Sequence, residues 1–254
     1  MSYTLRDGRH KKHARMDRRA GLLMPIPKLI FRTVPVHTSA AVEEWWASTK
    51  ALHPDFEHIT YREPVDPAAF PITSPYWERC ESGAQKAGLI RLEGLWLHGG
   101  IYLDSDVQVY RSLVPLLQLR GFAVYEDADV VPDAVLGAEC RHPAIDACLK
   151  LALKRIDENS GDFRTDGAWG TGPGVTNTVL RERDDWLLLP PGTFYPYHYT
   201  EKKKRRHEDF SQTPWTFAAH HWDHSWSSKS SFSGKVAEWA AAFAHRVRSV
   251  ISGR

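Results

Sequence analysis

LHGGIYLDSDVQVY (residues 97–110) contains the strongest structural signal in the chain. Its two glycines are typical of a helix end, and the short apolar run after them predicts a buried strand. The strand delivers Asp104 and Asp106 to a chain reversal, with one small residue between them. Two carboxylates so close raise each other's pKa, and a hard divalent cation removes that conflict because it favours oxygen ligands. The stretch therefore predicts a metal at the end of a strand.

The segments around this stretch predict an α/β fold. Residues 28–34 and 58–62 have strand propensity, and the residues between them predict a helix that begins after Ser39 and ends at Pro54. Strand, helix and strand in that order indicate a parallel crossover unit. The remaining pattern predicts helices at 82–98, from Pro143 onward and over 236–247, and a short helix after a tight loop at 171–174. It predicts strands at 122–125 and 186–189.

Length and composition indicate a globular protein with one sizeable domain. The chain has 254 residues, of which 25% are charged and 42% hydrophobic, with a net charge of +2. It has no apolar run long enough to span a membrane and no signal-peptide core, so we expect a cytoplasmic location. The odd number of cysteines, three, without metal-ligand spacing, fits a reducing compartment.

We expect two parts along the chain, a basic flexible arm at 1–24 and a catalytic domain at 25–254. Residues 1–21 contain seven Lys and Arg against two Asp, with almost nothing apolar to bury. A solvated tail is the favoured interpretation, and contact with nucleic acid or another anionic surface is the alternative. The basic run at 202–206 has two interpretations as well, a solvated loop or a holder of an anionic acceptor.

An Asp-x-Asp pair by itself is weak evidence, because surface acids pair by chance. The apolar strand and the Gly-Gly helix end around it strengthen the metal interpretation. The haloacid-dehalogenase phosphotransferases also place Asp-x-Asp after a strand, but they have Thr or Val where this chain has Gln108. A metal-dependent phosphotransferase or phosphohydrolase is therefore an alternative that this position disfavours.

Residues 84–107, AQKAGLIRLEGLWLHGGIYLDSDV, resemble the signature of glycosyltransferase family 32, whose members have a sugar-binding region containing a DXD motif. The resemblance comprises a helix with Arg91, the Gly-Gly end and Tyr-Leu-Asp-x-Asp. Further matches follow in the family's order, namely its first strand, its Thr-Gly-Pro loop and its closing His-x-Trp-x-x-Ser-Trp motif, at 26–30, 171–173 and 220–226. The family includes fungal mannosyltransferases and bacterial capsule enzymes, and is related to the large clostridial glucosylating toxins.

The resemblance implies a GT-A type fold, a Rossmann-like α/β domain with a mixed, mainly parallel central sheet flanked by helices. It implies a glycosyltransferase that moves a sugar, with retention, from a UDP- or GDP-sugar to an acceptor, with Mn²⁺ or Mg²⁺. Such an ion stabilises the diphosphate charge that grows as the sugar–phosphate bond breaks. The acceptor is open among a glycan, a lipid, a protein and modified DNA. The missing signal and anchor favour a bacterial or phage enzyme.

The family pattern also implies roles for single residues. Asp106 is a direct metal ligand, and Asp104 shares the metal and reaches the ribose of the donor. His220 is the third ligand, and His224 is the alternative. The structural interpretation of either residue is a histidine that is bonded within an aromatic cluster. Arg91 matches the arginine that contacts the donor, since its planar fork suits phosphate or sugar oxygens, and a structural salt bridge is its alternative role. Asp104, Asp106 and Arg91 are thus the predicted catalytic residues.

The closing motif supplies further donor contacts. Ser225 and Trp226 match the residues that cover the diphosphate and the sugar in the related toxins. With ten tryptophans in the chain, Trp222 and Trp226 are singled out only through this motif. A catalytically silent relative that binds nucleic acid or an anionic surface is a third interpretation of the whole chain.

Four positions depart from the family pattern. Gly88 stands where the family has an Asp that binds hydroxyls of the donor sugar. Phe31 and Val34 stand at the positions of the family's His and base-stacking Trp, so we expect base recognition to be altered or supplied by Phe31 or Tyr61. Asp133 stands where Asn is usual and is a candidate site residue. These departures leave the sugar and the base of the donor undetermined, whereas the metal chemistry does not depend on them.

Overall fold

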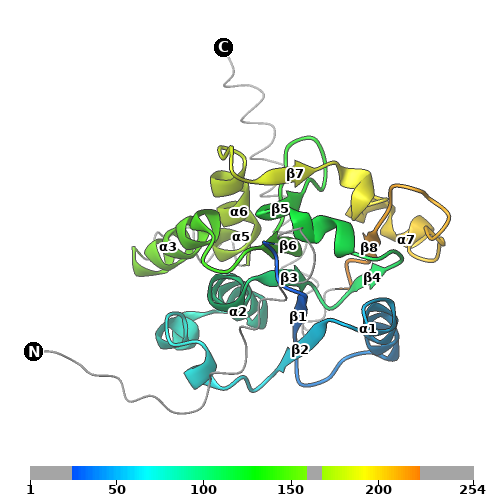
Figure 1. Cartoon of the computed structure of the whole chain (residues 1–254). Helices are drawn as coiled ribbons and strands as arrows, with labels where there is room; N and C mark the ends of the chain where they lie inside the picture. The colour runs from blue at the N-terminus through cyan, green and yellow to red at the C-terminus, as the bar shows by residue number, and fades with distance from the viewer. Residues whose placement is uncertain (1–24, 159–167, 224–254) are drawn as a thin grey trace, which may run out of the picture.

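A six-stranded mixed sheet runs through the computed structural model, which describes residues 25–158 and 168–223 (Figure 1). Three neighbouring pairs are parallel, and the two pairs that involve β6 are antiparallel. The mixed, mainly parallel sheet predicted for a GT-A type domain is therefore confirmed. The order is β2–β1–β3–β6–β5–β7, with β1 Leu29–Val34, β2 Glu57–Arg62, β3 Gly100–Leu103, β5 Gly121–Val124, β6 Val135–Ala138 and β7 Leu187–Leu189.

The first three elements form the predicted parallel crossover. Helix α1 (Ala40–Leu52) begins where the Ser39 side chain accepts a hydrogen bond from the Val42 amide, and it ends at His53, one residue before Pro54. Strands β1 and β2 then pair in parallel from Leu29 opposite Glu57 to Val34 opposite Arg62. Every residue of β1 is buried, because β1 lies between β2 and β3.

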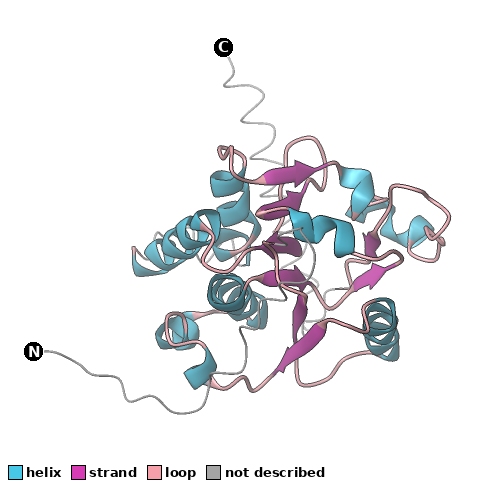
Figure 2. Cartoon of the chain, viewed as in Figure 1, coloured by secondary structure: helices cyan, strands magenta, loops and turns pink. Residues whose placement is uncertain are grey.

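Helices cover both faces of the sheet (Figures 1 and 2). On one face, Leu92 and Leu149 pack against the sheet in one apolar core; on the other, Trp46 and Leu117 pack in a second core. The first face carries α2 (Gly83–His98), α3 (Pro143–Asp157), α5 (Ala168–Thr171) and α6 (Pro173–Leu180), and the second carries α1 and the 3₁₀ helix η3 (Val114–Gln118). The other short helices are η1 (Pro67–Ala69), η2 (Ser74–Arg79), η4 (Pro191–Thr193), η5 (Tyr199–Glu201) and α7 (Lys202–Arg205).

The Gly-Gly helix end is where α2 passes directly into β3. Gly99 and Gly100 have φ angles of +67° and +97°, which residues with a Cβ rarely adopt. A Cβ on Gly99 would also lie 2.7 Å from the Cys140 amide nitrogen, and one on Gly100 would lie 2.7 Å from the Leu29 carbonyl oxygen. Both glycines are therefore required by backbone conformation and by close packing.

A second, two-stranded sheet joins distant parts of the sequence. Strand β4 (Val107–Val109) pairs antiparallel with β8 (Ala218–His220), so that Val107 lies opposite His220. This pairing places β8, near the end of the described residues, beside the strand that follows the DXD motif. The site described below is built on this small sheet and on the carboxyl end of β3.

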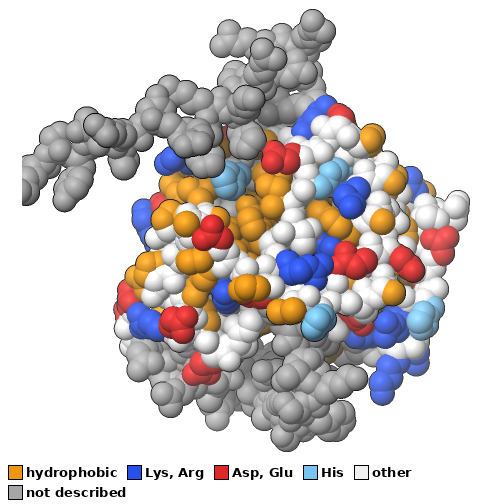
Figure 3. All heavy atoms as spheres, turned by 90° about the horizontal axis from the view of Figure 1, so that it is seen from below, with side chains coloured by type: hydrophobic (Ala, Val, Ile, Leu, Met, Phe, Trp, Pro, Cys, Tyr) orange, Lys and Arg blue, Asp and Glu red, His pale blue; other side chains and the backbone are white. Residues whose placement is uncertain are grey.

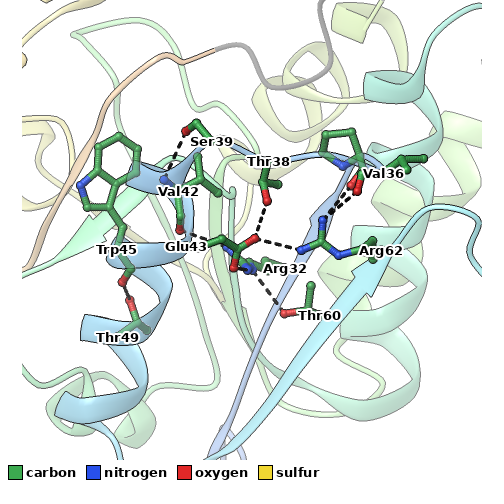
Figure 4. A network of polar contacts seen from close by, with 11 residues as sticks. Arg32, Val36, Thr38, Ser39, Val42, Glu43, Trp45, Thr49, Thr60 and Arg62 are labelled. Atoms are coloured by element: carbon green, nitrogen blue, oxygen red, sulfur yellow. Dashed lines mark hydrogen bonds and ion pairs between the residues drawn. The ribbon is translucent and has the colours of Figure 1, made fainter.

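A buried arginine fastens α1 to the sheet (Figure 4). Arg32 on β1 donates to Glu43 Oε2 at 2.6 Å and to Thr60 Oγ1 at 3.2 Å. Glu43 also accepts hydrogen bonds from Arg62 and Thr38. Burial raises the pKa of Glu43, but the hydrogen bonds from its three partners outweigh burial and lower that pKa to about 2. Glu43 is thus a carboxylate that links α1 to β1 and β2.

Two predictions about local structure need correction. Residues 171–174 are not a tight loop: Thr171 ends α5 and Pro173 begins α6, since Pro is well suited to the first position of a helix. The basic run at 202–206 forms the short helix α7 rather than a loop. The predicted arm at 1–24 and the predicted helix at 236–247 lie outside the described residues. Within the described part, no helix combines the length and the apolar character needed to cross a bilayer.

Candidate metal and donor site

The two aspartates of the DXD motif occupy the turn between β3 and β4. The Val107 amide donates to the Asp104 carbonyl at 3.1 Å and closes the predicted chain reversal. The Asp104 amide donates to the Ala134 carbonyl at 2.8 Å, which fastens the turn to the residues preceding β6. The positions of both carboxylates are therefore set by backbone hydrogen bonds on either side of them.

Strand β8 brings His220 to this turn. His220 Nε2 lies 3.1 Å from Asp106 Oδ1, although the two residues are 114 positions apart in the chain. One ligand atom from each of Asp104, Asp106 and His220 lies within 4.8 Å of the others. Among residues 25–158 and 168–223, this is the only such group of acids, histidines or cysteines. The structure thus brings together the three predicted metal ligands, whereas His224 lies outside the described residues.

The donor set fits a hard divalent cation. Carboxylates are the preferred ligands of Mg²⁺ and Mn²⁺, and an imidazole nitrogen is a common ligand of transition metals. Asp106 is oriented by its second oxygen, Oδ2, which accepts from the Asp223 amide at 2.5 Å. Asp104, Asp106 and His220 are therefore the residues that would hold the ion.

Asp106 and His220 shift each other's pKa. Burial raises the pKa of Asp106 and lowers the pKa of His220. Their mutual attraction and hydrogen bond reverse both effects, so the pKa of Asp106 lies below its usual range and the pKa of His220 lies above it. Because a ligating imidazole must be deprotonated, binding of a cation would release the His220 proton.

Arg91 on α2 holds Asp104 from the opposite side. Its Nη2 lies 2.6 Å from Asp104 Oδ1, and the same oxygen accepts from the Tyr102 hydroxyl at 2.7 Å. Its Nη1 pairs with Asp133, and its guanidinium lies 4.3 Å from the centre of the Tyr102 ring. Burial lowers the pKa of Arg91, but the charges of Asp104 and Asp133 outweigh burial and raise it. The salt bridge considered as an alternative role for Arg91 is therefore present.

A carboxylate lies beside the departure at Gly88. A Cβ built on Gly88 would lie 3.8 Å from Asp133 Oδ2 and 3.6 Å from the Thr171 carbonyl oxygen. Asp133 is buried and precedes β6, and Thr171 belongs to the Thr-Gly-Pro segment. The space next to position 88 is thus faced by an acid from another element, and two of the matched segments, residues 84–107 and 171–173, meet there.

His221 bonds the turn of the DXD motif through its backbone, while its ring contacts other residues. Its amide donates to the Asp106 carbonyl at 2.9 Å, and its ring stacks on Trp45 with centroids 4.3 Å apart. Its two ring nitrogens are engaged with Gln108 at 3.0 Å and the Tyr197 hydroxyl at 2.9 Å. Burial, followed by the charge of the neighbouring histidine, lowers the pKa of His221 to about 4. His221 is therefore neutral at pH 7. It was not predicted, and the histidine doublet in HHW is the sequence signal that could have indicated it.

The basic helix α7 packs against the segment that orients Asp106. Lys202 bonds to the Trp222 carbonyl oxygen, and Arg206 Nη2 lies 3.5 Å from Asp223 Oδ1. Asp223 is the residue whose amide bonds Asp106. Two residues of the basic run thus contact residues 222 and 223, next to the turn of the DXD motif.

Residues 39–123 match the model of a family described as "Glycosyltransferase sugar-binding region containing DXD motif". The match covers about a third of the chain. The matched span contains α1, α2, β3 and the DXD turn, and it ends within β5. The resemblance inferred from residues 84–107 is therefore confirmed.

Two fungal mannosyltransferases are among the similar proteins. Inositol phosphoceramide mannosyltransferase 2 of Schizosaccharomyces pombe is 26% identical over 187 residues, which are 68% of this chain and 51% of that protein. Mannosyl phosphorylinositol ceramide synthase SUR1 of Saccharomyces cerevisiae is 26% identical over 176 residues, 66% of this chain and 45% of that protein. The chain spans about half the length of these relatives.

Solved structures with some likeness to this chain include a toxin glycosyltransferase. The PaToxG glycosyltransferase has a TM-score of 0.48 and 16% identity, over 62% of this chain and 69% of that one. An active-site mutant of LgtC has a TM-score of 0.46 and 13% identity, over 84% of this chain and 95% of that one.

Nine buried side-chain polar atoms of the described residues lack a hydrogen-bond partner. Those of His58, His142 and Trp186 belong to β2, to the N-cap of α3 and to the residue before β7, and Arg91 Nη1 is in the salt bridge with Asp133. Most buried polar atoms in proteins are bonded, so a group of unbonded ones indicates a place for a polar ligand. The remaining five atoms are Arg91 Nε, Thr171 Oγ1, Tyr195 Oη, His220 Nδ1 and Trp222 Nε1. Tyr195 was not predicted, because the Pro- and Tyr-rich segment at 190–199 matches no motif. The other four belong to motifs that the sequence had indicated.

Phe31 does not face this site. It is 1% exposed, and its ring packs edge-on against Tyr61 and Tyr102, with centroids 6.0 and 5.3 Å away. The prediction that Phe31 contacts the nucleotide base is therefore wrong, because β1 is an inner strand and Phe31 points into a core. Base contact by Tyr61 stays a prediction. Ser225 and Trp226 lie outside the described residues.

Proposed function

We propose that this chain is a metal-dependent glycosyltransferase that moves a hexose from a nucleotide-diphosphate sugar to an acceptor. The observation that carries the proposal is the cluster of Asp104, Asp106 and His220, within 4.8 Å of one another, at the DXD turn of the glycosyltransferase region. A divalent ion held there would stabilise the charge that develops on the leaving diphosphate. Retention of configuration, as the resemblance implies, is part of the proposal.

The protein's own contribution is orientation. Asp104 is held by Arg91 and Tyr102, and Asp106 is held by the Asp223 amide, so the carboxylates do not have to be ordered when the donor arrives. Arg91 remains charged at any physiological pH and lies beside Asp104, which we propose reaches the ribose. The buried, unbonded Nε of Arg91 is the atom we assign to the donor.

The donor and acceptor are proposed only as classes. Both fungal relatives are named for mannosyl transfer to an inositol phosphoceramide, so a GDP-linked mannose is the first donor to test, ahead of UDP-sugars. A lipid with an anionic head group is accordingly the first acceptor class, with glycans, proteins and modified DNA behind it. A cytoplasmic location and a bacterial or phage source stay predictions.

The test is a panel of GDP-, UDP- and dTDP-sugars with Mn²⁺, scored for nucleotide release. We expect release from one donor, abolished by EDTA and lowered at least about 100-fold in Asp106→Asn, because the ion loses a ligand. The control is Asp55→Asn, which changes an exposed carboxylate paired with Lys28. Unchanged release in Asp106→Asn, or release without a metal, would contradict the proposal.

The same panel separates the other two interpretations. Turnover of simple phosphate esters without a nucleotide sugar would indicate a phosphohydrolase. A salt-dependent association with DNA that Asp106→Asn leaves unchanged would indicate a nucleic-acid binder. The face of the molecule shown in Figure 3 intersperses Lys and Arg with Asp and Glu and has no broad patch of one sign.

A further inference from the structure

The geometry points to the Tyr195 hydroxyl as a binding group for a hydroxyl of the transferred sugar. This inference rests on the proposed function and adds a specificity-determining residue that none of the sequence motifs contains. It is carried by the position of the ring, by the hydroxyl's lack of a partner, and by the charges around it.

The position of Tyr195 is fixed from two sides. It follows η4, and its amide donates to the Pro191 carbonyl at 2.7 Å. Its ring lies edge-on to the proposed ligand His220, with centroids 5.6 Å apart, and at 5.7 Å from the ring of Trp222. Tyr195 therefore belongs to the second apolar core and also borders the proposed metal ligand His220.

The Tyr195 hydroxyl has no hydrogen-bond partner in the described part of the chain, although the residue is only 3% exposed. The comparison with two other buried tyrosines is informative. Tyr102 bonds Thr33 and Asp104, and Tyr197 bonds His221. An unbonded buried hydroxyl costs about 1–3 kcal/mol, and phenylalanine would avoid that cost. A hydroxyl kept under these conditions indicates a ligand that bonds it.

The surrounding charges identify the kind of ligand. Burial raises the pKa of Tyr195, and the negative charges of Glu126, Asp104 and Asp133 raise it further against the positive charge of Arg91, so the hydroxyl stays protonated. Glu126 itself faces His198, with 3.4 Å between Oε1 and Nε2. A neutral polar group suits such surroundings, in which acids lie beside the guanidinium of Arg91.

A sugar hydroxyl suits this arrangement because it both donates and accepts. Carboxylates can only accept hydrogen bonds, whereas a phenol can do both. One sugar hydroxyl can therefore donate to an acid and accept from Tyr195. The proposed metal, by contrast, would bind the diphosphate. The sugar and the diphosphate of the donor would therefore be bound by different groups of one site.

The test compares binding of a nucleotide with and without its sugar. Dissociation constants for GDP, GDP-mannose, UDP and UDP-glucose, each with Mn²⁺, are measured calorimetrically for the wild-type protein, Tyr195→Phe and Tyr76→Phe. Tyr76 is the matched control, since its hydroxyl bonds Asp157 at 3.3 Å on the exposed surface. Thermal unfolding of the three proteins is recorded alongside.

We expect Tyr195→Phe to bind the free nucleotide as the wild type does and to bind the nucleotide sugar about three- to tenfold more weakly, the effect of one lost hydrogen bond. Its unfolding temperature should equal or exceed the wild-type value, because an unbonded polar group has been removed. Tyr76→Phe should keep both dissociation constants.

Three results would overturn the inference while leaving the proposed function intact. They are equal weakening of nucleotide and nucleotide sugar, no weakening of either, and a lower unfolding temperature, which would assign the hydroxyl to a structural partner. A wild-type protein that binds none of the four nucleotides with Mn²⁺ would overturn the proposed function, and the assignment of Tyr195 with it.

Discussion

The charge balance of the site depends on one side chain, Arg91. Its fork contacts Asp104 through Nη2 and Asp133 through Nη1; the guanidinium and Asp133 are buried, and the Asp104 side chain is 27% exposed. Without the guanidinium, two carboxylates would share a buried space and repel each other. A lysine ammonium is a compact point charge, and it cannot reproduce a planar bridge between two acids.

We therefore expect Arg91→Lys to lower the free energy of unfolding by about 3 kcal/mol or more, since a buried carboxylate loses its partner. The measurement is urea unfolding at pH 7. Arg79→Lys is the control: Arg79 pairs with Asp157 at 2.8 Å at an exposed position, where such a pair contributes at most about 1 kcal/mol. Similar losses in the two variants would contradict the bridging role of Arg91.

The sequence allowed some of these residues to be predicted and not others, for physical reasons. Asp104 and Asp106 follow a buried strand, a pattern that is visible within 14 residues. His220 was available only through a resemblance, because a pairing across 114 residues leaves no local periodicity. Phe31 was misassigned because the face to which a strand residue points depends on the neighbours of that strand. Tyr195 lay in a segment without a repeating pattern.

Helix α2 is the element on which the site and the sheet both depend, and its two inner glycines have different surroundings. A Cβ on Gly94 would lie 2.8 Å from Phe31 Cε2, closer than real Cβ contacts occur. A Cβ on Gly88 would meet its nearest neighbour at an ordinary 3.6 Å. Close packing explains Gly94, whereas backbone space does not explain Gly88.

These surroundings predict opposite effects of one substitution on stability. Gly94→Ala should destabilise the protein by about 1–3 kcal/mol, because overpacking against Phe31 exceeds the gain in helix propensity. Gly88→Ala should be neutral or stabilising by up to about 1 kcal/mol. Chemical unfolding of both variants checks the pair, and a loss in Gly88→Ala that matches the loss in Gly94→Ala would contradict it.

Helix α1 should be sensitive to acid through Glu43. Because the pKa of Glu43 falls from 4.5 to about 2 on folding, its ionised form stabilises the protein fully above about pH 4.5, and this contribution is lost as the pH falls toward 2. Thermal unfolding of wild-type and Glu43→Gln proteins between pH 2 and 7 tests this. We expect the wild type to be the more stable protein at pH 7 and the difference to shrink below pH 4.5. A difference independent of pH would exclude a role for the charge.

Helices and strands were predictable where the hydrophobic pattern agrees with the capping residues and helix-ending glycines. The α1 and α2 boundaries follow from Ser39, Ser82 and the glycine pair, and the parallel pairing of β1 with β2 follows from the crossover rule. The antiparallel direction of β6 was not predictable, since direction depends on the path of the chain between strands rather than on composition. Short helices such as α7 give too few residues for a periodic signal.

For the molecule as a whole, metal binding should stabilise the fold by joining β3, β4 and β8. At a Mn²⁺ concentration of about 100 times Kd, we expect a gain of about 2.7 kcal/mol in the free energy of unfolding, seen as a higher unfolding temperature. The gain should be lost in His220→Ala and should weaken at low pH, where His220 keeps its proton. A full Mn²⁺ effect in His220→Ala would remove that residue from the proposed ligand set.

The pairing of β4 with β8 also has a consequence for how the protein is made. On the ribosome, Asp106 is synthesised 114 residues before His220, a delay on the order of ten seconds at ordinary elongation rates. Throughout that interval the nascent chain holds the acids of the turn without the histidine. The three proposed ligands are thus together only once β8 has been synthesised, and any message truncated before the codon for Ala218 yields a product without the third.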